Sequence, residues 1–177
     1  MTSESTPPTL LSLPGELRNR IYRHALVSDL LIRVTRTKDW EQPALLATSK
    51  QIRHEARKIY YLENRFRLIA ANMDSAAITA FAQNVGPYLH DDLQIVVEPT
   101  GRPDWNNLLR WLKDFFEGRS IPDSESPEAG SPMKVVTNAF DIVRELAKAG
   151  LAWEQVVPVL ESYRNGVDGA GHTWRWQ

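Results

Sequence analysis

The 177-residue sequence contains no cysteine. This absence excludes disulfide frameworks, thiolate zinc sites, iron–sulfur ligation and cysteine nucleophiles. Long hydrophobic runs are missing as well, because the sequence has no uninterrupted apolar stretch of the roughly 18 residues that a membrane-spanning helix needs. Residues 1–9, MTSESTPPT, show no basic region followed by an apolar run, so they do not resemble a secretory signal. We therefore expect an intracellular protein, cytoplasmic or nuclear, with no membrane partner.

Common catalytic motifs are also absent. The sequence has no G-x-S-x-G elbow, phosphate-binding loop, G-x-G-x-x-G turn or H-E-x-x-H pair. We therefore assign no catalytic residue, no cofactor and no metal site. An unrecognised enzyme or small-ligand binder, with a pocket between the sheet and the C-terminal helices, stays open as an alternative.

Composition is that of one soluble globular domain, with 42% hydrophobic and 24% charged residues. A chain of this length buries roughly 70% of its unfolded surface, so it can build a core without disulfides or metals. Charge is unevenly distributed: residues 1–70 contain 12 Lys and Arg against 7 Asp and Glu, whereas residues 71–177 contain 9 against 15. The basic part could meet an acidic partner, or the two parts could attract each other.

Hydrophobic periodicity predicts a mainly helical α+β domain over residues 10–166, after a disordered lead-in at 1–9 and before a tail at 167–177. The expected strands are residues 30–37, 65–71 and 92–98, and the strand–helix–strand order of the last two favours parallel pairing. The expected helices are a three-turn helix from Pro14 and the ranges 43–63, 77–85, 105–118, 133–149 and 152–164. Residues 119–132 are expected to form a flexible loop, and Pro158 should kink the last helix or mark its start.

Two helical segments carry the most specific patterns. The first, LPGELRNRIYRHAL, places Pro14 in the first turn and aligns Leu13, Leu17, Ile21 and Ala25 on one stripe. The second runs from Pro43 to Glu63 and aligns Leu45, Ser49, Ile52, Ala56 and Ile59, which predicts one long helix.

Together these segments resemble the F-box-like proteins of filamentous fungi. The match comprises, in the first block, Leu13, Pro14, Glu16, Leu17, Arg18, Asn19, Ile21 and Tyr22, and in the second Leu45, Leu46, Lys50, Gln51, Ile52, Arg53, Glu55, Ala56, Tyr60, Tyr61, Asn64 and Phe66. The chain departs from this group at Ser49, where a cysteine is usual. It departs from a true F-box in having a strand, rather than a middle helix, between the two blocks.

The resemblance implies a non-enzymatic protein-interaction module, an adaptor that docks on the Skp subunit of SCF ubiquitin ligases. The candidate docking residues are then Leu13, Pro14, Leu17 and Ile21. A structural role is the alternative, because Leu-Pro-x-Glu-Leu is a good helix start in itself, and Arg18, Arg53 and Glu55 could form charged pairs between helices. The sequence indicates no oligomeric state.

Two further groups are candidate partner-binding residues. Lys50, Arg53 and Arg57 belong to a basic helix face at 50–58, which could bind nucleic acid, although nucleic-acid-binding domains usually have a pI above about 9 and this chain has one of 6.4. Trp40, Trp174 and Trp176 lie in a turn and a tail with weak periodicity, so they could form a contact patch. Alternatively, the tail folds back on its own domain.

Overall fold

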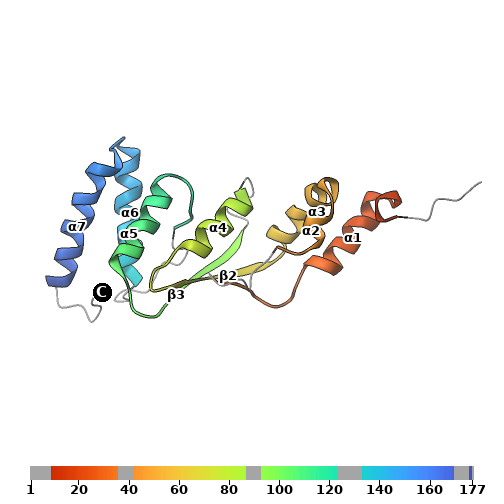
Figure 1. Cartoon of the computed structure of the whole chain (residues 1–177), viewed down its shortest axis with the longest axis horizontal. Coiled ribbons are helices and arrows are strands. Elements are labelled where there is room, and N and C mark those ends of the chain that lie inside the picture. Colours follow the sequence, from red (N-terminus) through yellow and green to blue (C-terminus); the bar gives the residue numbers. More distant parts are fainter. Residues whose placement is uncertain (1–8, 36–41, 87–92, 123–132, 170–175, 177) are drawn as a thin grey trace, which may run out of the picture.

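The computed structural model describes residues 9–35, 42–86, 93–122, 133–169 and 176. The elements in this part of the chain are a 3-10 helix Leu10–Ser12, α1 Gly15–Leu26, β1 Ile32–Val34, α2 Leu45–Thr48, α3 Lys50–Leu62, β2 Arg65–Ala71, α4 Ala76–Val85, β3 Gln94–Thr100, α5 Trp105–Phe116, α6 Met133–Lys148 and α7 Trp153–Gly169. The molecule is elongated, with α1–α3 at one end, α5–α7 at the other and α4 between them (Figure 1). The prediction of a mainly helical α+β domain is confirmed.

The sheet is three-stranded and parallel, in the order β1-β2-β3. Ile32 pairs with Phe66 across β1 and β2, and Arg65 to Ala71 pair in sequence with Gln94 to Thr100 across β2 and β3. The helices α2 and α3 connect the first two strands, and α4 connects the second two. The predicted parallel strand–helix–strand unit is therefore confirmed, and a second such unit precedes it.

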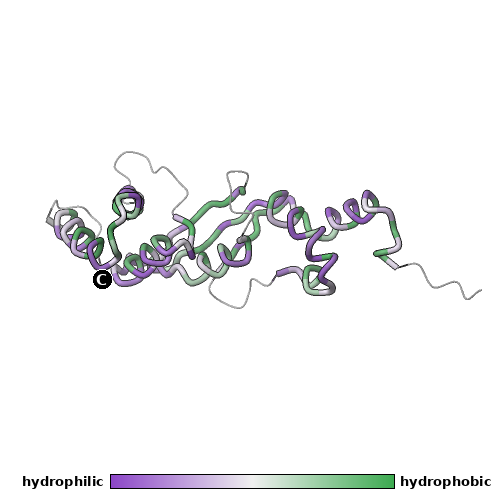
Figure 2. The backbone as a smooth tube through the Cα atoms, turned by 90° about the horizontal axis from the view of Figure 1, so that it is seen from above, coloured by the Kyte–Doolittle hydropathy of each residue, from purple (hydrophilic) through white to green (hydrophobic). Residues whose placement is uncertain are grey.

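One continuous core runs through the molecule, from Tyr22 on α1 to Leu160 on α7. Its centre is Phe66 on β2, whose ring lies 4.9 Å from that of Phe81 on α4 and 6.0 Å from that of Tyr61 on α3. Such aromatic pairs stabilise a core beyond the area that they bury. Figure 2 shows hydrophobic stretches of backbone in the middle of the molecule, where Figure 1 places the strands.

The single long helix predicted for residues 43–63 is wrong, because the chain breaks at Ser49 into α2 and α3. Ser49 has an extended backbone, and its hydroxyl accepts a hydrogen bond from the amide of Ile52 at 3.1 Å, so it is the N-cap of α3. Serine competes for backbone hydrogen bonds in this way at helix starts. The guanidinium of Arg53 then donates to the carbonyl of Leu46 at 2.7 Å, which satisfies an unpaired group at the end of α2.

The helix α1 also differs from expectation. Pro14 lies just before its first turn, where the Pro14 carbonyl accepts from the amides of Leu17 and Arg18. The residues buried on α1 are Tyr22 and Leu26, whereas Leu17, Ile21 and Ala25 are exposed. The apolar stripe therefore does not face the core, because the buried side of α1 is built around hydrogen-bonded polar groups.

Several boundaries shift. The first strand spans Ile32–Val34 rather than 30–37, and the third spans Gln94–Thr100 rather than 92–98. The last helix continues through Pro158 to Gly169, so it includes the first residues of the expected tail. The start of the expected loop at 119–132 is anchored by the indole of Trp111, which donates to the carbonyl of Ile121 at 2.9 Å. The lead-in 1–8, Trp40 and the loop residues 123–132 lie outside the described residues.

The two oppositely charged parts of the chain form few ion pairs with each other. Among the described residues, Arg67 and Glu98, 3.2 Å apart, are the pair that joins residues 1–70 to residues 71–177.

The turn that follows β2 is hydrogen-bonded to the turn that follows β3. Asn72 has a positive φ of 50°, its amide donates to the carbonyl of Thr100 at 2.7 Å, and its side-chain oxygen accepts from the amide of Arg102 at 3.0 Å. Gly101 has φ of 76°, and a Cβ there would lie 2.2 Å from this same side-chain oxygen. Glycine at 101 is therefore required by both conformation and space.

We expect Gly101→Ala to destabilise the protein more than Gly150→Ala. Gly150 has the same φ but open space around it, so alanine there costs only the left-handed conformation, about 1–2 kcal/mol. At 101 the loss of the hydrogen bond between Asn72 and Arg102 adds about 0.5–1.5 kcal/mol. Urea denaturation of both variants measures the difference, and equal destabilisation would show that the turn does not depend on this contact.

Candidate functional site: the α1–α3 face

A carboxylate on α3, that of Glu55, holds α1 in place. The guanidinium of Arg18 donates to it through Nε at 2.8 Å and through Nη2 at 2.7 Å, and the hydroxyl of Tyr22 donates to it at 2.9 Å. Gln51, one turn earlier on α3, donates a fourth hydrogen bond at 3.0 Å. Arg18 also donates to the carbonyl of Leu13 at 2.6 Å, which ties the start of α1 to the same group.

This arrangement changes the acidity of the groups involved. The side chains of Arg18 and Glu55 are only 15% and 21% exposed, so their two-pronged pairing is partly shielded from water. Hydrogen bonds from Arg18 and Gln51 lower the pKa of Glu55 from 4.5 to about 2. Burial, together with the hydrogen bond to Glu55, raises the pKa of Tyr22. Glu55 therefore stays ionised and Tyr22 stays a donor across the physiological pH range.

Asn64, which follows α3, forms a second connection between the helices. Its side chain is almost completely buried and donates to the carbonyls of Leu26 and Tyr60, both at 2.8 Å, while accepting from the amide of Ser28 at 2.8 Å. The carbonyls at the ends of α1 and α3 would otherwise lack partners in a buried position. The contacts that join α1 to α3 thus involve five of the residues that carry the F-box-like resemblance: Arg18, Tyr22, Gln51, Glu55 and Asn64.

The basic face predicted on α3 is smaller than expected. Arg53 caps the end of α2, and the guanidinium of Arg57 lies over the ring of Tyr61, 5.8 Å from its centre. Lys50, His54 and Lys58 are exposed to solvent. Of the three basic residues proposed to bind a partner, Lys50 and Arg53 are therefore exposed, and Arg57 is half-buried against Tyr61.

The exposed apolar residues of α1 are the clearest surface feature at this end of the molecule. Leu17 is 44% exposed and Ile21 is 40% exposed, and with Ala25 they form an outward row that we term the α1 stripe. Leu11, on the preceding 3-10 helix, is also exposed, although the sequence did not single it out. Leu13 is half-buried and Pro14 is exposed beside the stripe.

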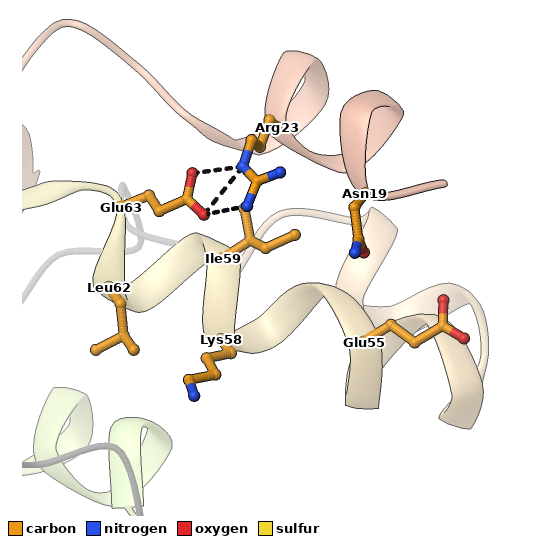
Figure 3. Close-up of a pocket in the computed structure, with 7 residues that line it drawn as sticks. All are labelled: Asn19, Arg23, Glu55, Lys58, Ile59, Leu62 and Glu63. Carbon is orange, nitrogen blue, oxygen red and sulfur yellow. Dashed lines mark hydrogen bonds and ion pairs between the residues drawn. The ribbon is translucent and has the colours of Figure 1, made fainter. Parts of the chain in front are cut away.

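A shallow groove lies between α1 and α3, on the other flank of α1 from the stripe. Its volume is about 310 Å³, and Figure 3 shows the side chains that line it: Asn19, Arg23, Glu55, Lys58, Ile59, Leu62 and Glu63. Arg23 and Glu63 pair across it, with Nε 2.9 Å from Oε2. Because its acidic and basic groups pair with each other and Glu55 is already occupied, the groove has no unpaired acid for proton transfer. This groove is not the pocket that the sequence leaves open as an alternative, which would lie between the sheet and the C-terminal helices.

Of the two tryptophans in the tail, the structure describes Trp176. The ring of Trp176 lies 5.1 Å from that of Trp105 in an edge-to-face arrangement and packs against the core. Trp176 is half-buried, so one part of its ring packs beside Trp105 on α5 and the rest stays accessible, and its role in partner binding stays a prediction. Trp174 lies outside the described residues.

Within the described ranges, no group of three or more His, Asp or Glu side chains could hold a metal ion. In the same part of the chain, no helix combines the length and apolar character needed to cross a bilayer. Comparisons with protein-family models, with curated proteins and with solved structures return no match for this chain.

We expect the stabilisation provided by Glu55 to disappear in acid. Because its pKa is lower in the folded chain than in the unfolded one, the contribution is complete above pH 4.5 and is lost as pH falls towards about 2. The difference in unfolding free energy between the wild type and Glu55→Gln should therefore shrink across this interval. Urea denaturation at several pH values tests this, and a difference independent of pH would contradict the assigned pairing.

Proposed function

We propose that this chain is a non-enzymatic protein-interaction module of F-box-like type that docks a partner through the α1 stripe. The observation that carries the proposal is the exposure of Leu17 and Ile21 on a helix that the hydrogen bonds of Arg18 and Tyr22 to Glu55 hold in place. Apolar residues at positions i and i+4 are typical anchors of a helix that lies in a partner's groove. Holding α1 rigid lowers the conformational entropy that such docking would cost.

The partner we propose is the Skp adaptor of an SCF ubiquitin ligase. The resemblance of residues 13–26 and 43–66 to F-box-like proteins supports this choice. Among the residues described between α1 and α2, the regular element is β1 rather than the middle helix of a true F-box. We therefore propose that the adaptor contacts α1 alone.

A nucleic-acid function is less well supported. It relied on Lys50, Arg53 and Arg57 acting together, and the last two make contacts within the fold. The exposed basic groups of α3 are Lys50, Arg53, His54 and Lys58, which form a small surface for a phosphate backbone, since affinity grows with the number of phosphates neutralised.

We expect the double substitution Leu17→Asp and Ile21→Asp to weaken binding of purified adaptor at least about ten-fold, equivalent to ~1.4 kcal/mol. Charged groups at an apolar contact would have to be desolvated without partners. Isothermal titration calorimetry measures the affinity, and affinity purification with mass spectrometry from the native host identifies what the wild type retains.

A matched control is Val159→Asp, because Val159 on α7 is also 40% exposed and lies at the other end of the molecule. Both variants should fold normally, since surface substitutions usually change stability by less than about 0.5 kcal/mol. Recovery of a partner set without Skp and cullin would remove the ubiquitin role. Equal binding by the wild type and the stripe variant would remove the stripe as the docking surface.

A further inference from the structure

One face of the sheet is covered by helices, and among the described residues the other face presents arginines beside the half-buried apolar Ile69 and Val96. On β2, Phe66, Leu68 and Ala70 are fully buried, whereas the alternate residues Arg65 and Arg67 are at least partly exposed. Successive side chains of a strand point to opposite faces, so these arginines lie on the side away from the core. Parallel sheets usually have both faces covered, which makes this open face unusual.

Three arginines gather on the open face. Arg33 on β1 is paired in register with Arg67 on β2, and Arg65 lies two residues before Arg67 on the same strand. Arg33 and Arg65 are exposed, and the side chain of Arg67 is 40% exposed. Like charges directly opposite each other on neighbouring strands are destabilising, so this grouping has a cost in the isolated chain.

The acidic groups near these arginines balance only part of their charge. Glu98 on β3 lies 3.2 Å from Nη1 of Arg67, and Arg65 donates to a backbone carbonyl, that of Asp29, at 3.1 Å. Among the described residues, Arg33 has neither an ion pair nor a side-chain hydrogen bond. Among the described residues, these three arginines face one glutamate, so this group of side chains has a net positive charge.

We propose that this open face binds an extended acidic segment of a partner protein, with carboxylates at every second residue. An extended chain repeats its side-chain direction every two residues, roughly 6.6 Å, which is also the spacing of Arg65 and Arg67 along β2. Guanidinium groups pair with carboxylates through two parallel hydrogen bonds, which favours arginine over lysine at such a site. This surface is separate from the α1 stripe and does not depend on the adaptor proposal.

A single-stranded nucleic acid fits this face less well. Such ligands usually stack their bases on aromatic side chains, and the outward positions of β1, β2 and β3 among the described residues carry none. The charged groups alone would provide only three phosphate contacts.

The test uses two fluorescein-labelled peptides of equal composition, one with alternating glutamate and threonine and one with its glutamates in a block. The full-length protein should bind the alternating peptide more tightly, as measured by fluorescence anisotropy. Arg33→Gln and Arg65→Gln should each weaken binding about two- to five-fold. Glu98→Gln should strengthen it, because that substitution removes the competing carboxylate beside Arg67.

Arg110→Gln is the matched control, because Arg110 is an exposed arginine on α5 and carries the same charge. It should leave the affinity unchanged. The proposal is overturned if neither peptide binds, if both bind equally, or if the control weakens binding as much as Arg33→Gln. Tighter, Arg33-dependent binding of oligothymidylate than of the alternating peptide would also overturn it. All these variants should bind the adaptor as the wild type does. A failure of the acidic-segment proposal can therefore be distinguished from a failure of the α1 stripe proposal.

Discussion

The N-terminal end of the fold depends on the carboxylate of Glu55. It receives hydrogen bonds from Arg18 and Tyr22 on α1 and from Gln51 on its own helix. A partly shielded carboxylate with four donors is far more stable ionised than protonated, and so the group also fixes which side of α1 faces α3. Asn64 adds a second, fully buried connection at the other end of the two helices.

This polar connection explains why the apolar residues of α1 lie outside. If the helix were held by hydrophobic burial alone, Leu17 and Ile21 would face the core, because their burial would be worth more than that of an arginine. Instead Arg18 and Tyr22 take the inner side, and the leucine and isoleucine remain at the surface. A helix oriented by specific hydrogen bonds can present apolar groups to a partner and still have one defined position.

The sequence was sufficient for the fold class, the parallel sheet and the strand at 65–71, because β-branched runs and helical periodicity are local signals. The apolar spacing alone did not indicate the break at Ser49, since it fits one helical stripe, whereas the Ser49 cap on Ile52 and the contact of Arg53 with Leu46 favour two helices. It could not orient α1, because periodicity finds an apolar stripe without showing what covers it. The open face of the sheet was missed for a related reason: Arg33 and Arg67 are 34 residues apart, and only strand register brings them together.

The most direct test of this account is a double-mutant cycle on Arg18 and Glu55, using Arg18→Met and Glu55→Gln, with unfolding free energies measured in urea at pH 7. The same cycle on Arg23→Met and Glu63→Gln provides the comparison, because that pair is more exposed, at 52% and 35%. The account predicts a clearly larger coupling between Arg18 and Glu55 than between Arg23 and Glu63. A coupling equal to or smaller than that of the exposed pair would contradict the claim that Glu55 holds α1 in place.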